Sequence, residues 1–225
     1  MGQRPITVGH RGASALAPEN TLRAFEVAIE YGLDMAELDV HLSRDQKLVV
    51  IHDADLARLA GRADRIADLT AAELAAFNVP TLSEVCAIAR GRMGIYVELK
   101  GPRTGEALAE LVNTGAAEGV TLISGSFVPG LVAELKAAAP EVPRSVLFSR
   151  TTVDEMLRVC KDLETSYAHP CFRPVDKPMV DAFHAARLLV MTPHTNDAAE
   201  ARLFKDIGVD VIATDDPRVL AIPRA

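Results

Sequence analysis

Short hydrophobic segments alternate with longer segments of helical periodicity along the chain. The hydrophobic segments are rich in β-branched residues and have the length of buried strands. Eight segments fit this description: residues 6–9, 35–40, 95–99, 121–124, 145–148, 166–169, 188–192 and 209–214. The pattern predicts eight strands, joined by connections that are long enough to contain helices.

The segments between the strands place hydrophobic residues three and four positions apart, as one buried helix face requires. Two such faces are clear: Leu22, Phe25, Ile29 and Leu33, and then Ala201, Phe204 and Ile207. Asn20 and Asn196 stand where the N-caps of these helices are expected, and Gly32 and Gly208 stand just past their ends. Both helices therefore have predicted limits.

Regular alternation of strand and helix predicts a parallel sheet covered by helices. Eight repeats close naturally into a single (β/α)8 barrel, the TIM-barrel fold, and an open doubly wound sheet is the alternative. No low-complexity tract or shift in composition divides the chain. We therefore expect residues 1–225 to form one domain.

An additional strand, residues 47–52, follows the second barrel strand after a very short connection. Such a connection permits only an antiparallel hairpin. A two-residue turn in its middle brings Asp39 opposite His52, whereas a shift of one residue would place His52 on the other face. We expect this hairpin to begin a short cap insertion, about residues 41–80, in the α/β barrel.

The composition places the chain among globular proteins. Hydrophobic residues make up 49% and charged residues 24% of the sequence. No apolar run approaches the roughly 20 residues that cross a bilayer, and the first residues lead into a strand without a secretory signal. We expect a cytoplasmic protein with no transmembrane segment. The formal net charge of −7 argues against a nucleic-acid partner. The sequence does not indicate the oligomeric state.

The three cysteines are Cys86, Cys160 and Cys171. Their odd number and wide spacing predict reduced thiols and not a disulfide or zinc site. Cys86 and Cys160 fall within helical patterns and are expected in the core, while Cys171 follows a strand.

Charged residues concentrate at the C-terminal ends of the predicted strands, where barrel enzymes hold their reactive groups. They come from three strand ends and the hairpin: His10 and Arg11, Glu37 and Asp39, Glu98 and Lys100, and His52. Each residue alone has a structural explanation, such as a solvated strand face or a turn. Because all of them lie at one end of the predicted barrel, an active site is favoured over these separate structural explanations.

Three of these residues, Glu37, Asp39 and Glu98, are acids that would repel one another without a cation among them. Oxygen ligands favour Mg²⁺ or Ca²⁺ over zinc. The sequence therefore predicts a divalent metal site built from these three carboxylates.

The remaining members of the group suit a phosphodiester. Arg11 offers a bidentate guanidinium and Lys100 a point charge, both fitting a phosphate. His10 and His52 titrate near neutrality and are candidates for general base and general acid. Which histidine acts as base stays open.

Four further polar or aromatic positions carry weaker signals. Ser126 and Phe127 end the fourth predicted strand and either line the pocket, binding substrate, or form a plain turn. His169 precedes a proline, which restricts it to an extended shape and favours a structural role. His194 lies in a proline-containing loop, and only a weak signal favours its contact with substrate.

The sequence resembles the glycerophosphodiester phosphodiesterase family over nearly its whole length. The motifs that carry the resemblance are His10-Arg11-Gly12, Pro18-Glu19-Asn20-Thr21, Glu37-Leu38-Asp39-Val40, His52-Asp53, Pro80-Thr81-Leu82, Glu98-Leu99-Lys100, Ser126-Phe127 and Ile212-Ala213-Thr214-Asp215.

The resemblance implies roles for seven of these residues: a metal held by Glu37, Asp39 and Glu98, acid–base catalysis by His10 and His52, and phosphate binding by Arg11 and Lys100. It also implies a reaction. The 2-hydroxyl of the substrate glycerol attacks phosphorus, and water opens the resulting cyclic phosphate to glycerol 3-phosphate.

Two segments depart from the family pattern. The insertion over residues 53–79 is short and has Arg58-Leu59-Ala60-Gly61 where the family has Arg-Thr-Thr-Asn-Gly. Met191-Thr192-Pro193-His194 stands in place of a Trp-Thr-Val-Asn-like segment. These changes leave the phosphate chemistry intact and bear on which alcohol is accepted.

Hydrolysis of small glycerophosphodiesters is therefore the leading hypothesis. The alternatives are a related phosphodiesterase acting on lysophospholipids, a metal-dependent isomerase or lyase on the same barrel, and a non-catalytic phosphate-binding barrel.

Overall fold

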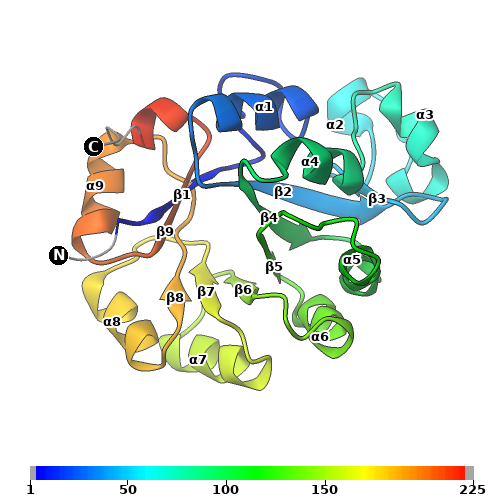
Figure 1. Cartoon of the computed structure of the whole chain (residues 1–225). Helices are drawn as coiled ribbons and strands as arrows, with labels where there is room; N and C mark the ends of the chain where they lie inside the picture. The colour runs from blue at the N-terminus through cyan, green and yellow to red at the C-terminus, as the bar shows by residue number, and fades with distance from the viewer. Residues whose placement is uncertain (1–3, 221–225) are drawn as a thin grey trace.

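A ring of eight parallel strands surrounded by helices is the central feature of the computed structural model, which describes residues 4–220 (Figure 1). The strands follow the order β8-β7-β6-β5-β4-β2-β1-β9, and a parallel bridge between Met191 and Val211 links β8 to β9. The barrel strands are β1 (Ile6–Gly9), β2 (Met35–Leu42), β4 (Gly94–Leu99), β5 (Leu122–Ser126), β6 (Arg144–Phe148), β7 (Tyr167–Pro170), β8 (Leu189–Val190) and β9 (Val211–Thr214).

This arrangement confirms the predicted (β/α)8 barrel. Each of the eight predicted segments overlaps a barrel strand, although the bounds differ by one or two residues at most strand ends. Backbone hydrogen bonds from Thr192 to Val211 and from Asp210 to Val190, both 3.1 Å, continue the pairing across the seam between β8 and β9. An open sheet would leave these two strands as unpaired edges.

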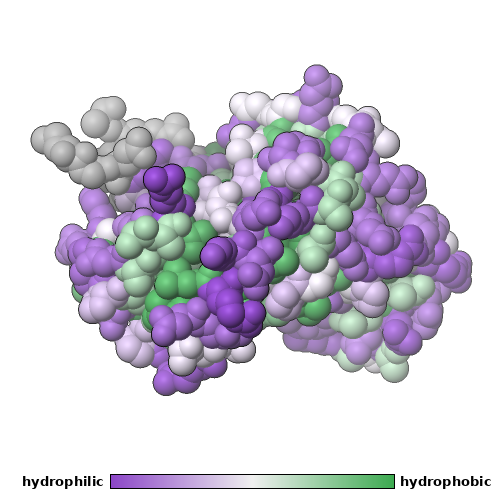
Figure 2. All heavy atoms as spheres, turned by 90° about the horizontal axis from the view of Figure 1, so that it is seen from below, coloured by the Kyte–Doolittle hydropathy of each residue, from purple (hydrophilic) through white to green (hydrophobic). Residues whose placement is uncertain are grey.

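Helices form the outer layer of the barrel and connect its strands (Figure 1). The helices of the outer layer are α1 (Leu22–Glu30), α4 (Leu82–Ala89), α5 (Thr104–Asn113), α6 (Pro129–Ala138), α7 (Val153–Asp162), α8 (Lys177–Ala185) and α9 (Ala198–Asp206). The insertion after β3 holds α2 (Ala57–Ala60), the 3-10 turn η1 (Ile66–Asp68) and α3 (Ala71–Ala75), and a second 3-10 turn, η2 (Pro217–Leu220), follows β9. Hydrophilic residues cover most of the face seen from below, and the largest patch of hydrophobic residues lies in its left half (Figure 2).

The predicted N-caps were wrong by one residue in both helices. Thr21 caps α1, with its side chain accepting from the Ala24 amide, and Asp197 caps α9 in the same way. Asn20 and Asn196 are instead turned towards the mouth of the barrel, where each contacts an acidic residue.

The hairpin after β2 forms, but its register differs from the prediction. Strand β3 (Leu48–Val50) pairs with β2 so that Val40 lies opposite Val50, and Asp39 therefore lies opposite Ile51 and not His52. The turn is longer than expected, because Gln46 adopts a left-handed conformation with φ of 60°. His52 lies beyond the end of β3, so strand alternation no longer determines its direction.

The insertion after this hairpin has a small core of its own. The buried residues of this core are Val49, Ile51, Leu56, Ile66, Leu74 and Val79. They form a cluster separate from the one that packs α1, α4 and α5 against the barrel. This cluster supports the loop that carries His52.

The cysteines are free, as predicted, with Cys86 and Cys160 buried and Cys171 partly buried. Among residues 4–220, no helix has the length and apolar character needed to cross a bilayer.

Candidate active site

A cavity of about 260 Å³ opens at the C-terminal ends of the barrel strands. Its lining includes the predicted site residues His10, Arg11, Glu37, His52, Glu98 and Lys100. The side chains of Arg173, His169 and His194 also line it, and its apolar part includes Tyr96, Phe127, Leu147 and Met191. The structure thus brings six of the seven residues singled out from strand ends and the hairpin to one cavity, and the seventh, Asp39, lies among them.

Three buried carboxylates form a cluster at the cavity. Glu37 and Asp39 share one face of β2, and Asp39 lies beside Glu98 in the parallel pairing of β2 with β4. One oxygen from each of the three acids lies within 4.8 Å of the others. Exposure is 5% for Glu37, 1% for Asp39 and 8% for Glu98. Strand geometry therefore converges three acids on one small volume.

Burial and the neighbouring acid Asp39 raise the pKa of Glu37 to about 8. Burial and Asp39 also raise the pKa of Glu98, and the adjacent Lys100 offsets only part of this increase. The cluster therefore holds more negative charge than its own cations neutralise, which is the condition that a bound divalent ion relieves.

An unpaired acceptor next to the cluster also fits an ion. Asn20 is 4% exposed and donates from Nδ2 to the Asp39 carboxylate at 2.9 Å. Its Oδ1 atom is buried and has no hydrogen-bond partner within residues 4–220. Three carboxylates and a free amide oxygen are the oxygen donors that Mg²⁺ or Ca²⁺ requires.

The two predicted phosphate-binding cations border the acid cluster. The Arg11 backbone amide donates to Glu37 at 2.9 Å, and its guanidinium lies 2.9 Å from Glu19 and 3.5 Å from Asp39. Lys100 Nζ lies 2.9 Å from Glu98 and 3.4 Å from Asp39. Both cations are thus anchored at the edge of the cavity.

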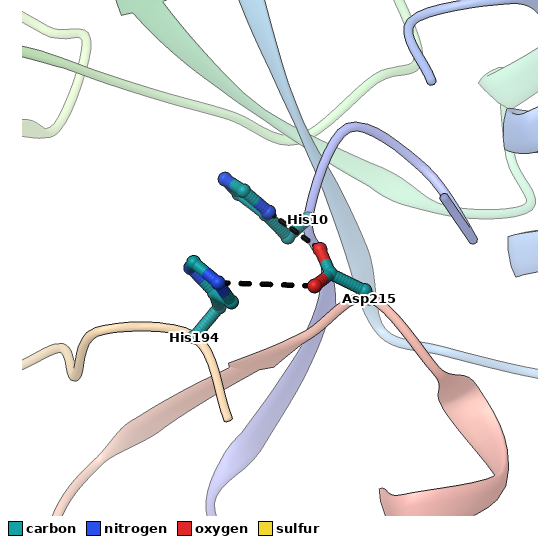
Figure 3. Close-up of side chains that lie close together, drawn as sticks. All are labelled: His10, His194 and Asp215. Carbon is teal, nitrogen blue, oxygen red and sulfur yellow. Dashed lines mark hydrogen bonds and ion pairs between the residues drawn. The ribbon is translucent and has the colours of Figure 1, made fainter. Parts of the chain in front are cut away.

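His10 is oriented by a carboxylate from the other end of the chain (Figure 3). Its Nδ1 lies 2.7 Å from Asp215 Oδ1, and its Nε2 lies 4.0 Å from Glu37. Asp215 is itself held by the Asn196 and Ser14 side chains, at 2.7 and 2.9 Å. Although burial favours the neutral ring, Asp215 and Glu37 raise the pKa of His10 above its ordinary value.

His194 stacks on His10 beside the same carboxylate (Figure 3). The ring centroids are 4.2 Å apart and the planes differ by 7°. His194 Nε2 lies 3.7 Å from Asp215 Oδ2. The short bond between His10 and Asp215 favours a hydrogen-bonded group at this position over a second metal site, although the three residues lie close enough for one.

His52, which also lines the cavity, has a similar carboxylate partner. Its Nδ1 lies 2.7 Å from Asp53, and Asp53 is bound by Arg58 at 2.5 Å. Arg58 also contacts Glu19 at 2.6 Å, and Glu19 contacts Arg11. A chain of ion pairs therefore joins His52 to the arginine at the cavity.

The comparisons with known proteins agree on one family. The model of the glycerophosphoryl diester phosphodiesterase family matches residues 10–219. The chain belongs to this family. It is 30% identical to the glycerophosphodiester phosphodiesterase of Bacillus altitudinis, over 92% of this chain and 93% of that protein.

Solved structures of family members have the same fold. An Oleispira antarctica phosphodiesterase in complex with the product sn-glycerol-3-phosphate is 27% identical, with a TM-score of 0.86 over 97% of this chain and 96% of that one. The glycerophosphodiester phosphodiesterase of Thermotoga maritima is 28% identical, with a TM-score of 0.83 over the full length of both chains.

Membership of the glycerophosphoryl diester phosphodiesterase family confirms the resemblance drawn from the sequence motifs and the expectation of an enzyme of this type. It favours phosphodiester hydrolysis over the isomerase, lyase and non-catalytic hypotheses.

Ser126 and Phe127 were both weaker candidates for the lining of the pocket, and the structure places them differently. Phe127 lines the cavity and is 45% exposed. Ser126 is buried, and its hydroxyl donates to the Leu99 carbonyl and accepts from the Val128 amide. The structure therefore places Ser126 at the end of β5, bound to backbone groups, and not in the lining of the cavity.

His169 has the structural contacts that its sequence position suggested. It lies in β7 with Nε2 2.9 Å from the Thr192 carbonyl and Nδ1 3.3 Å from the Tyr96 hydroxyl. Burial lowers the pKa of His169 to about 4, so the ring is neutral.

Sequence reasoning missed the residues that hold the site residues in place. Asp215, Asp53 and Asn20 all fall within the family motifs, but no role was predicted for Asp215 or Asp53, and Asn20 was predicted only as a helix cap. Their signal was a polar residue immediately after a strand or before a helix, adjacent to a predicted site residue. Their partners became clear only from the contacts in space.

Proposed function

We propose that this enzyme hydrolyses glycerophosphodiesters to glycerol 3-phosphate and an alcohol, with a divalent metal and two histidines. The observation that carries the proposal is the convergence of three buried acids, two carboxylate-bound imidazoles and two cations on one cavity. The phosphodiesterase of Oleispira antarctica, whose product is sn-glycerol-3-phosphate, supports the choice of substrate class.

Glu37, Asp39 and Glu98 would hold Mg²⁺ or Ca²⁺. When bound, such an ion orients the attacking oxygen and offsets negative charge on the phosphate. Arg11 and Lys100 would bind phosphate oxygens, the first as a fork and the second as a point charge.

The two histidines act through their Nε2 atoms. Asp215 and Asp53 each engage the Nδ1 atom of one ring, which leaves Nε2 of that ring to exchange a proton with substrate. One imidazole takes the proton of the glycerol 2-hydroxyl as its oxygen bonds to phosphorus. The other protonates the alcohol oxygen as its bond to phosphorus breaks, and water then opens the cyclic phosphate.

Enzymatic release of glycerol 3-phosphate tests the proposal. Purified protein would be incubated with glycerophosphocholine, glycerophosphoethanolamine and a lysophospholipid, with Mg²⁺ and Ca²⁺ in parallel. His10→Ala and His52→Ala should each lower kcat by about 100-fold or more, while His184→Ala, a histidine on α8 that is outside the cavity, serves as the matched control. Full activity in either site variant would refute the assigned roles.

A further inference from the structure

The position of His194 indicates a part in the reaction that its weak sequence signal did not reveal. It follows β8, whereas His10 follows β1, and the two rings lie nearly parallel in Figure 3. The His194 side chain is 47% exposed and that of His10 is 22% exposed. His194 therefore covers one face of the His10 ring and is the more exposed of the two side chains.

The backbone of His194 is firmly placed. Its carbonyl accepts a hydrogen bond from Arg173 at 2.9 Å, and Arg173 is bound in turn to Glu200 on α9 at 2.6 Å. The preceding residue is Pro193, whose ring restricts the backbone. The loop thus presents the imidazole in a defined orientation.

The contacts of His10 leave one direction of movement open. Asp215 fixes Nδ1, but a single hydrogen bond allows the ring to tilt about the line joining the two groups. The His194 ring, at a centroid distance of 4.2 Å, blocks this tilt on one side. Aromatic rings at such separations attract one another in offset stacks.

We propose that His194 is a positioning residue, whose stacked ring holds the His10 imidazole in the plane that directs Nε2 at the reacting atoms. This inference rests on the proposed role of His10. It gives no proton-transfer task to His194, because the ring contacts Asp215 only at 3.7 Å. Burial and the neighbouring His10 also lower the pKa of His194, which favours the neutral form of this ring.

Three substitutions of His194 distinguish a role of the flat ring from a role of its nitrogen atoms. His194→Ala removes both, His194→Phe keeps a flat ring, and His194→Gln keeps a polar group without a ring. We expect His194→Ala to lower kcat about 10-fold with KM within about twofold of the parent value, since misorientation of a catalytic group impairs the chemical step. His194→Phe should recover kcat to within about threefold.

A second measurement reports on the stack itself. The ring protons of His10 should show an upfield shift in proton NMR spectra of the full chain, and the shift should be lost in His194→Ala and retained in His194→Phe. Thermal unfolding of each variant tests whether the barrel is intact, and His184→Ala is the histidine control.

Three results would overturn the proposal: unchanged kcat in His194→Ala, an increase confined to KM, or recovery by Gln and not by Phe. The first would show that the stack is dispensable, the second that His194 binds substrate directly, and the third that its nitrogen is the active feature. If the parent protein releases no glycerol 3-phosphate from any diester, the proposed function fails, and the NMR shift still tests the stack.

Discussion

Each of the two site histidines is bound by its own aspartate. Asp215 engages His10 and Asp53 engages His52, both at Nδ1 and both at 2.7 Å. A carboxylate at Nδ1 keeps the proton on that nitrogen and stabilises the imidazolium when it forms. The aspartates thus determine which nitrogen faces the substrate.

Asp215→Asn should therefore impair catalysis without disrupting the fold. The amide cannot stabilise the imidazolium, and it can present a donor to Nδ1, which favours the wrong tautomer. We expect kcat to fall by about 100-fold or more. Asp210→Asn is the matched control, because Asp210 also binds a histidine, His184, outside the cavity. Equal kcat values for the two variants would contradict this role for Asp215.

The turn between β1 and α1 places Arg11 and Asn20 through unusual backbone conformations. Arg11, Gly12 and Asn20 have φ values of 53°, 83° and 57°. A Cβ atom at Gly12 would lie 2.7 Å from the Ala24 backbone carbon. This close approach brings the turn onto the first helix and positions Arg11 at the acid cluster.

Gly12→Ala is predicted to destabilise the protein by about 3 kcal/mol, because it combines a left-handed backbone with a steric clash. Gly115→Ala should cost only about 1 kcal/mol, since Gly115 has a φ of 78° but open space around it. Urea unfolding of both variants measures the two free energies. Similar losses would show that the contact with α1 contributes little.

Elements were predicted better from the sequence than their exact pairing was. The strands and the acids at their ends could be found because burial and alternation leave local patterns. The hairpin register could not, since it depended on a left-handed Gln46 that adds a residue to the turn. Asn20 was predicted to be a helix cap because cap residues and site residues have the same kinds of polar side chain. Only the contact of Asn20 with Asp39 shows that it belongs to the site.

The whole barrel is needed to assemble the site. His10 and Asp215 are separated by 205 positions in the chain and meet because β1 pairs with β9. Closure of the barrel next to β9 also depends on the loop after β8, which carries both His194 and the carbonyl bound by His169. The site partners of His10 could therefore not be predicted from local sequence.

Stability should depend on pH through His169. The pKa of His169 is lowered to about 4 by burial, against an ordinary value of 6.5. Between these values the unfolded chain binds more protons, so the free energy of unfolding should fall by about 3 kcal/mol as the pH falls from 6.5 to 4. His169→Gln should lack this component. Urea unfolding across this range would show parallel pH profiles for both proteins if His169 were not involved.

Calorimetric titration of the purified chain with Mg²⁺ and with Ca²⁺ tests most directly whether the three buried carboxylates bind one divalent ion. The pKa of Glu37 is about 8 without an ion, so binding at pH 7 should release a proton, and affinity should weaken as the pH falls. We predict one site per chain, binding heats that differ between buffers of unequal ionisation enthalpy, and loss of the site in Asp39→Asn. Absence of binding, or unchanged binding in Asp39→Asn, would contradict a metal held by Glu37, Asp39 and Glu98.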